Sequence, residues 1–142
     1  MKHFKLSEFC QSKTAKDHGI DMTPPERVKA SLEALVVNVL DPLREAVGKP
    51  IVVSSGYRPE KLNELIGGAA TSQHSLGQAA DINIGGMAPK QVCELIIKLG
   101  LPFDQLIMEF GRWTHVSYGP RNRRQVLTAK SVNGRTVYTP GL

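Results

Sequence analysis

Short apolar stretches separated by tight turns dominate the second half of this chain, and they constrain its fold more than any other feature of the sequence. Four stretches are predicted as strands: 105–109, 113–118, 125–129 and 135–138. Gly111 lies between the first two and Asn133-Gly134 between the last two. Asn-Gly is the strongest short signal for a β-hairpin, because both residues tolerate positive φ. The pattern therefore predicts strands that are mostly joined as hairpins.

The first half of the chain carries the patterns of helices. Residues 23–26 (TPPE) combine a capping threonine, Thr23, with proline in the first turn and a glutamate three residues on. Apolar residues recur at helical spacing over 28–43, so we expect one amphipathic helix that ends near Gly48. A second helix is predicted to begin at Pro89 and to be closed by Gly100.

These elements together define a fold class. A β-branched run at 51–55 and an alternating run at 80–84 add further strands to those of the second half. Because helices precede and flank strands that are mostly joined as hairpins, we predict an α+β fold with an antiparallel sheet. The chain has 142 residues and neither an internal repeat nor a long linker, so we expect a single domain over residues 1–142.

Several classes of protein do not match this sequence. No apolar run approaches the ~18 residues of a membrane-spanning helix, and the charged N-terminus lacks the apolar region of a secretory signal. Cys10 and Cys93 form neither a CxxC pair nor a disulfide framework, which is typical of free thiols in a reducing compartment. We expect a soluble protein that is synthesised in the cytoplasm and does not insert into membranes.

The net charge of +5 is unevenly distributed. All thirteen acidic residues occur at or before Glu109, whereas residues 110–142 contain no acid and six basic side chains: Arg112, Arg121, Arg123, Arg124, Lys130 and Arg135. A basic segment of this kind suits an anionic partner such as nucleic acid, a membrane surface or a cell-wall polymer. The alternative is a solvated face that only keeps the protein soluble.

Three residues occupy unusual places for their type. His74 lies in a loop rich in serine and glycine, Asp81 interrupts an apolar strand, and His115 lies in the middle of another strand. A carboxylate is costly to bury unless something cationic pairs with it. Two histidines and one carboxylate in such positions are what a metal site would require. Taken singly, each residue could also be a buried hydrogen-bonded histidine or a turn aspartate.

The sequence around these residues resembles a known family. The pattern SxHxxGxAxD at 72–81, followed by WxH at 113–115, is similar to the zinc D-Ala-D-Ala carboxypeptidase-like peptidases of the Hedgehog/DD-peptidase fold. That family includes DD-carboxypeptidases, D-Ala-D-Ala dipeptidases and phage endolysins. The resemblance extends over most of residues 4–118, including the SSGYR segment at 54–58 and the LSEF segment at 6–9.

The resemblance implies roles for individual residues. It implies three zinc ligands: His74, Asp81 and His115. Gly77 would let the loop bend back so that ligands seven residues apart converge. Arg58 resembles an arginine near the substrate, whose guanidinium could hold a carboxylate or a carbonyl of the peptide and assist the reaction. Ser72 and Gln73 are expected either to bind substrate in the same pocket or to support the loop.

The sequence departs from the family at the catalytic base. Many members have the pattern Glu-x-x-His, but Arg112 occupies the glutamate position before His115. The nearest acid is Glu109. If residues 110–112 form a three-residue hairpin loop, Glu109 pairs with Trp113 and lies diagonal to His115 on the same face of the sheet. We therefore predict Glu109 as the base; a two-residue loop would turn it away.

The implied function is hydrolysis of peptidoglycan stem peptides, at the D-Ala-D-Ala end or at the L-Ala-D-Glu bond. Zinc would lower the pKa of a water molecule to about 7 and polarise the scissile carbonyl. Glu109 would carry the proton to the leaving amine, and Arg58 would help zinc to stabilise the oxyanion.

Two other functions remain possible at this point. The first is a non-catalytic zinc domain that binds wall peptides, and the second is a basic nucleic-acid-binding module, although no binding motif supports it. We expect a monomer that does not bind nucleic acid. Its basic C-terminal segment would hold it on an anionic wall polymer. The absence of a signal peptide favours a phage or prophage lysis protein that reaches the wall by a separate export route.

Overall fold

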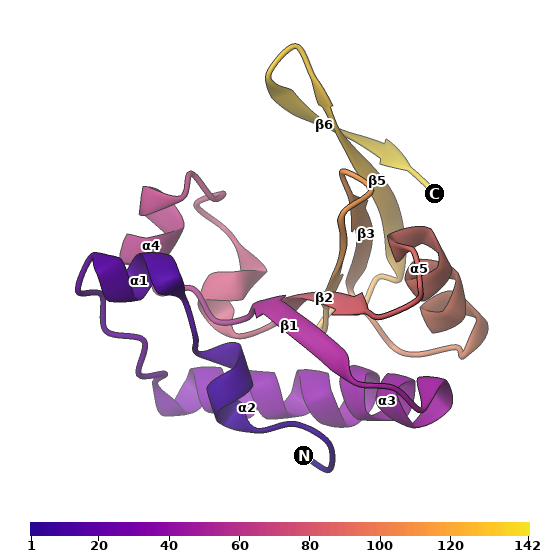
Figure 1. The fold of residues 1–142 in the computed structure, drawn as a ribbon, viewed down its shortest axis with the longest axis horizontal. Coiled ribbons are helices and arrows are strands. Elements are labelled where there is room, and N and C mark those ends of the chain that lie inside the picture. Colours follow the sequence, from indigo (N-terminus) through magenta and orange to yellow (C-terminus); the bar gives the residue numbers. More distant parts are fainter.

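The structure is a computed structural model that describes residues 1–142, with most helices in the first half and one six-stranded sheet (Figure 1). The elements in chain order are η1 (Leu6–Phe9), α1 (Lys13–Asp17), α2 (Glu26–Leu35), η2 (Val36–Leu40), α3 (Asp41–Val47), β1 (Ile51–Ser55), α4 (Glu60–Leu65), η3 (Gln73–Leu76), β2 (Ala79–Ile84), α5 (Pro89–Lys98), β3 (Gln105–Glu109), β4 (Trp113–Ser117), β5 (Gln125–Val132) and β6 (Arg135–Pro140). The α+β class is consistent with this arrangement.

The sheet has the strand order β1-β2-β4-β3-β5-β6, and it is mixed rather than wholly antiparallel. Four neighbouring pairs are antiparallel, but β3 and β5 run parallel, which corrects the sequence prediction. After β4 the chain returns to the start of β3, where the backbone N–H of Arg124 donates to Phe103 O and that of Gln125 to Asp104 O. β5 therefore begins beside the start of β3 and runs in the same direction.

The predicted long helix is present as three consecutive segments, α2, η2 and α3, of which η2 is π-helical. It ends at Gly48, which has a φ of 65°. Thr23 does not cap it, contrary to the sequence prediction: the helix starts after Pro25, and no side chain caps its first turn. None of the helices is both long and apolar enough to cross a membrane. Cys10 and Cys93 are free thiols.

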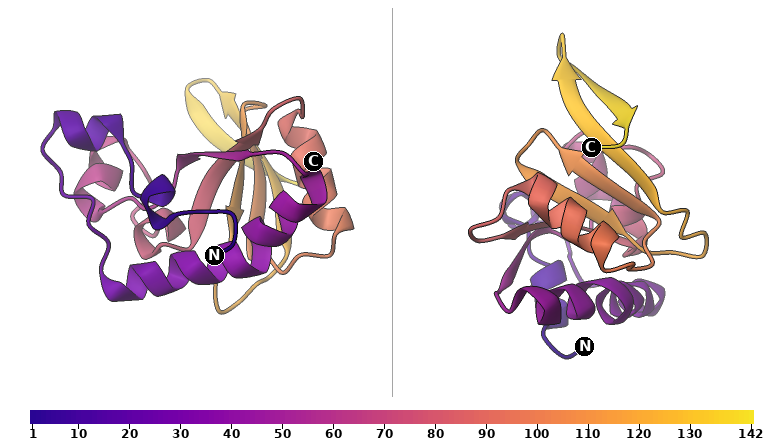
Figure 2. Two further views of the ribbon diagram at one scale, coloured as in Figure 1. Left: turned by 60° about the horizontal axis from the view of Figure 1, so that its bottom comes forward. Right: turned by 90° about the vertical axis from the view of Figure 1, so that its right-hand side faces the viewer.

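The two faces of the sheet have different roles. Successive residues of a strand point to opposite faces, and one face carries core residues of the central strands, including Ile82, Leu106 and Val116. Helix α5 contacts β2, β3 and β4, and Figure 2 shows it lying against the sheet. The opposite face carries Asp81 and His115. All three predicted polar residues of the strands, Glu109 included, therefore lie on the face away from the core.

The last two strands form a hairpin that projects from the body of the molecule (Figure 1). Asn133 and Gly134 both have positive φ, 51° and 76°, as the Asn-Gly signal predicted. Every residue of β6 is exposed, so this strand contributes nothing to the hydrophobic core.

Candidate metal centre

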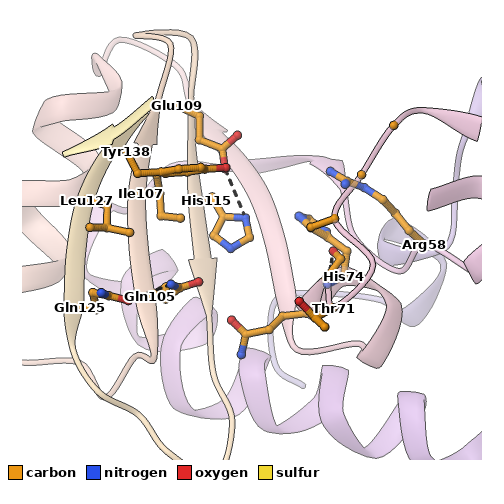
Figure 3. Close-up of a pocket in the computed structure, with 15 residues that line it drawn as sticks. Arg58, Thr71, His74, Gln105, Ile107, Glu109, His115, Gln125, Leu127 and Tyr138 are labelled. Carbon is orange, nitrogen blue, oxygen red and sulfur yellow. Dashed lines mark hydrogen bonds and ion pairs between the residues drawn. The ribbon is translucent and has the colours of Figure 1, made fainter. Parts of the chain in front are cut away.

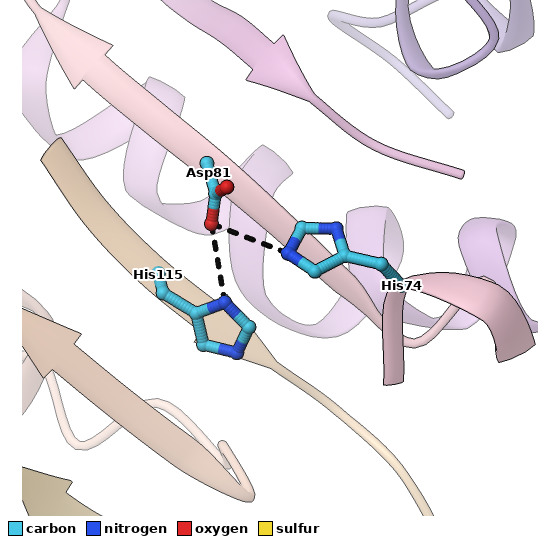
Figure 4. Close-up of side chains that lie close together, drawn as sticks. All are labelled: His74, Asp81 and His115. Atoms are coloured by element: carbon cyan, nitrogen blue, oxygen red, sulfur yellow. Dashed lines mark hydrogen bonds and ion pairs between the residues drawn. The ribbon is translucent and has the colours of Figure 1, made fainter. Parts of the chain in front are cut away.

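Three buried side chains from three different elements meet on the open face of the sheet. His74 belongs to η3, Asp81 to β2 and His115 to β4, and their exposed fractions are 3%, 4% and 8%. Asp81 and His115 are direct cross-strand partners, so the register of the sheet brings together two residues that are far apart in the sequence. Figure 4 shows that both histidine rings point at the Asp81 carboxylate.

A tight loop places His74 beside these strands. Ser72 caps η3 by accepting a hydrogen bond from the backbone N–H of His74. The loop then turns into β2 at Gly77, which has a φ of 72°. A Cβ on Gly77 would lie 2.7 Å from the carbonyl oxygen of Val28, so both the conformation and the space require glycine.

The distances between the three side chains fit a single metal ion. Asp81 Oδ1 lies 3.3 Å from His74 Nε2 and 3.1 Å from His115 Nδ1. The candidate ligand atoms all lie within 4.8 Å of one another. Ligand atoms that surround a tetrahedral zinc at about 2.0–2.1 Å are separated by about 3.3–3.4 Å. The two distances from Asp81 therefore match the spacing of zinc ligands.

The protonation state of His74 also favours binding of a cation at this site. Its Nδ1 lies 2.8 Å from the carbonyl oxygen of Gly56, which can only accept, so Nδ1 must carry a proton. Burial lowers the pKa of His74 and outweighs the attraction of Asp81, which leaves the ring neutral. Nε2 then presents a lone pair to the Asp81 carboxylate with no proton between them. A metal ion satisfies both groups, and the bond to Gly56 orients the ring for it.

Asp81 is held in its charged form. Burial alone would raise its pKa, but the hydrogen bond with His115 holds that pKa well below the usual range. Arg58 Nη2 lies 3.2 Å from Asp81 Oδ2, and Arg58 Nε donates to Ser55 Oγ at 3.0 Å. Oδ2 is therefore occupied by the guanidinium, while Oδ1 faces the two imidazoles.

The structure places Glu109 beside the three candidate ligands. Residues 110–112 form a three-residue loop and Glu109 pairs with Trp113, which confirms the register expected from the sequence. Glu109 Oε1 lies 3.6 Å from His115 Nδ1 (Figure 3). Burial raises the pKa of Glu109 against the opposing effect of His115, and the Asp81 charge raises it further. Arg112, at the family's glutamate position, is exposed and outside this cluster.

A cleft of about 590 Å³ opens onto the cluster (Figure 3). Arg58, Ser72 and Gln73 all line it. Gln73 also supports the loop, because its Nε2 donates to Asp104 Oδ2 at 3.0 Å and to Gln78 Oε1 at 3.2 Å.

Sequence reasoning missed the C-terminal wall of this cleft. Gln125 and Leu127 of β5 and Tyr138 of β6 line it, and Gln125 and Leu127 lie beside Gln105 and Ile107 of β3 on the same face of the sheet. The alternation within 125–129 could have shown that Gln125 and Leu127 share a face. Nothing in the local pattern showed that β5 pairs with β3, because that pairing is parallel and spans fifteen intervening residues.

The basic C-terminal residues are not equivalent. Arg123 Nε lies 2.7 Å from the buried carboxylate of Asp104, and its hydrogen bonds lower the pKa of Asp104 to about 2. Arg124 donates to Leu101 O and lies 4.7 Å from the centre of the Phe103 ring. These two arginines hold the chain between β4 and β5 in place. Arg121 also lies near Asp104, with its Nη2 4.0 Å from Oδ2. Binding of an anionic polymer stays a prediction, and it rests on the exposed basic residues that form no ion pair: Arg112, Lys130 and Arg135.

Comparisons with known proteins agree with the geometry. A family model described as Peptidase M15 matches residues 2–117, which include the whole metal cluster and Glu109. Over 47 residues the chain is 45% identical to the zinc D-Ala-D-Ala carboxypeptidase of Streptomyces albus G. That match covers 32% of this chain and 18% of the relative, so the chain spans only a small part of that protein. The C-terminal hairpin lies outside the residues matched to the family.

Proposed function

Because this chain belongs to the peptidase M15 family, we propose that it is a zinc-dependent peptidase that hydrolyses the stem peptides of bacterial peptidoglycan. The observation that carries the proposal is the His74–Asp81–His115 cluster, whose buried ligand atoms have the spacing of a zinc site. We further propose that residues 1–142 form one peptidase domain with the Hedgehog/DD-peptidase fold.

Each residue of the cluster has a defined part in this proposal. His74, Asp81 and His115 would hold the zinc, and Arg58 holds the Asp81 carboxylate in place through the contact of its Nη2 with Oδ2. Bound zinc supplies Lewis-acid activation of water and of the scissile carbonyl. The open cleft in front of the cluster leaves room for both reactants.

Glu109 is proposed as the general base. Its carboxylate accepts a proton from the attacking water and delivers it to the leaving amine. Burial suits Glu109 to this task, because a raised pKa makes a carboxylate a stronger base near neutral pH. Its position diagonal to His115 places it on the same face as the proposed ligands.

Arg58 is proposed to contact the substrate. Its Nε and Nη2 are bonded to Ser55 and Asp81, while Nη1 has no hydrogen-bond partner within the protein. Because Arg58 lines the cleft, Nη1 is available to a carbonyl or carboxylate oxygen of a peptide. Ser72 and Gln73 are proposed to line the same substrate pocket while they support the His74 loop.

The setting of the reaction is part of the proposal. The substrate would be a stem peptide cut at its D-Ala-D-Ala end or at its L-Ala-D-Glu bond. The enzyme would be made in the cytoplasm and reach the wall through phage-type release, acting as a monomer, with anionic wall polymer as a second partner.

Two measurements on the purified protein test the proposed function. Elemental analysis should find about one zinc per chain, and mass spectrometry of muropeptides after digestion of purified walls should find one new peptide terminus. The position of that terminus distinguishes carboxypeptidase from endopeptidase. Zinc without any cleavage would instead support the alternative of a non-catalytic wall-binding domain. A chain that takes up no zinc would overturn both.

A further inference from the structure

The metal cluster lies at one end of a row of residues that crosses the sheet. Asp81, His115, Ile107, Leu127 and Pro140 are successive cross-strand partners on β2, β4, β3, β5 and β6. The first two are proposed zinc ligands, and the remaining three are apolar. An apolar strip therefore leads from the metal cluster along the cleft floor to the C-terminal hairpin.

Different types of residue border the apolar strip on its two sides. In the adjacent row on one side, Glu109 pairs with Ala129, which in turn pairs with Tyr138. In the row on the other side, Gln105 pairs with Gln125, and their side-chain amides are joined by a 2.8 Å hydrogen bond. Figure 3 shows Tyr138 extending over the sheet towards Glu109, with Ile107 and Leu127 beside it.

Packing within the protein does not explain why a tyrosine occupies position 138. The residue is 54% exposed, and no residue of β6 belongs to the hydrophobic core. Yet its side chain lines the same cleft as Glu109 and extends towards it, and burial together with the charge of Glu109 raises the pKa of its hydroxyl. A large exposed aromatic side chain beside a proposed catalytic group is typical of a ligand contact.

We propose that this hairpin completes the substrate site, forming a hairpin subsite from Ile107, Leu127, Tyr138 and the Gln105–Gln125 pair. The subsite takes a neutral peptide segment whose short aliphatic side chain, next to the scissile bond, packs on Ile107 and Leu127 under the Tyr138 ring. The two glutamine amides offer hydrogen bonds to the backbone of the same segment. None of the five subsite residues is charged, so a charged side chain packed on Ile107 and Leu127 would find no partner among them and is disfavoured there.

This inference rests on the proposed function and extends it. Three of the five subsite residues, Gln125, Leu127 and Tyr138, lie outside the part of the chain matched to the family. The hairpin would therefore determine which peptide is cut, whereas the matched part of the chain carries the chemistry.

Variants of β6 test the subsite without touching the core. Tyr138→Ala should raise KM for a stem peptide about 3- to 10-fold, because it removes an aromatic contact, and should leave kcat and zinc content unchanged. Tyr138→Phe keeps the ring and should behave as wild type. Val137→Ala is the matched control, because Val137 is the adjacent exposed residue and points to the opposite face of β6.

The substrate should contain both an L-Ala-D-Glu and a D-Ala-D-Ala bond, so that either specificity is seen. If it is cleaved and Tyr138→Ala has the KM of wild type, the subsite is wrong while the proposed function stands. Equal losses in Tyr138→Ala and Tyr138→Phe would also overturn the apolar contact, because they would assign the effect to the hydroxyl.

If the peptide is not cleaved, its binding to the zinc-loaded protein, measured by nuclear magnetic resonance, still tests the subsite. If the peptide is not cleaved but shifts the amide signals of Leu127 and Tyr138, the proposed function fails and the subsite stands. If it is neither cleaved nor shifts those signals, both proposals fail.

Discussion

Asp81 on β2 and His115 on β4 are directly opposed across the sheet, and Asp81 Oδ1 lies 3.1 Å from His115 Nδ1. A one-residue slip of either strand would turn one of these side chains into the hydrophobic core. Two of the three proposed ligands are therefore fixed by the same register that buries the core residues next to them. His74 alone depends on a loop.

Loss of any one ligand should abolish zinc binding. We expect His74→Ala, Asp81→Ala and His115→Ala each to purify without stoichiometric zinc and without activity, because a three-ligand site has no redundancy. Elemental analysis after dialysis checks this. His18→Ala is the control, since His18 is exposed and outside the cluster, and it should retain zinc. Full zinc content in all three ligand variants would mean that the metal binds elsewhere.

Removing the carboxylate of Glu109 should separate zinc binding from turnover. Glu109→Gln should keep zinc and fold but lower kcat by at least ~10²-fold, the usual scale for a missing acid–base group. Glu94→Gln on α5 is the matched control, because Glu94 is exposed and does not line the cleft. Turnover near that of wild type in Glu109→Gln would show that another group acts as the base.

The glycine in the His74 loop should be essential for zinc affinity. Gly77→Ala introduces a Cβ 2.7 Å from Val28 O at a φ of 72°, and a non-glycine residue in this region costs about 1–3 kcal/mol. We expect a lower unfolding free energy and weaker zinc binding, measured by chemical denaturation and chelator competition. Gly85→Ala should change neither, because Gly85 has no strained φ and no neighbour within 4 Å of the added Cβ.

Much of this architecture was predictable because the determining signals are local. The β-branched run of β1 and the Asn133-Gly134 turn each indicate a structure within a few residues. The ligand set of His74, Asp81 and His115, by contrast, followed from the family resemblance. The position of Glu109 followed from the length of one loop, because hairpin register depends on the turn.

The parts that could not be predicted depend on contacts between distant residues. The parallel pairing of β3 with β5 is anchored by Asp104 and Arg123, which no local pattern connects. Without that pairing, Tyr138 and Leu127 have no known relation to the cleft. The C-terminal segment consequently looked like a charged appendage, whereas the structure makes it a wall of the site.

The Asp104–Arg123 ion pair should contribute to stability in a defined pH range. The pKa of Asp104 falls from 3.8 to about 2 on folding, chiefly through its hydrogen bond with Arg123. The stabilisation is therefore complete above about pH 4 and is lost as the pH falls through about 2. Urea unfolding at several pH values should show this loss in wild type. This loss of unfolding free energy at low pH should be absent in Asp104→Asn. If Asp104→Asn instead shows the same pH dependence of stability as wild type, other carboxylates are responsible for the acid unfolding.

The basic hairpin should hold the enzyme on an anionic wall polymer without affecting cleavage of a small peptide. Lys130 and Arg135 are exposed, and they lie on the face of the hairpin opposite to Leu127 and Tyr138, because residues of one strand alternate between faces. Lys130→Glu combined with Arg135→Glu should therefore weaken co-sedimentation with intact walls at low salt. It should leave kcat/KM for a soluble stem peptide nearly unchanged, because neither side chain lines the cleft.

Salt dependence provides the independent check on that attachment. Long-range attraction weakens steeply with ionic strength, since the Debye length is ~10 Å at 0.1 M and ~3 Å at 1 M. Wall binding by wild type should consequently fall towards that of the charge-reversed variant as salt is added, while peptide cleavage changes little. Lys98→Glu on α5 controls for net charge, because Lys98 is exposed but belongs to a different element. If Lys98→Glu weakens sedimentation as much per charge as the hairpin variant does, the attraction comes from overall charge and the hairpin is not a specific attachment surface.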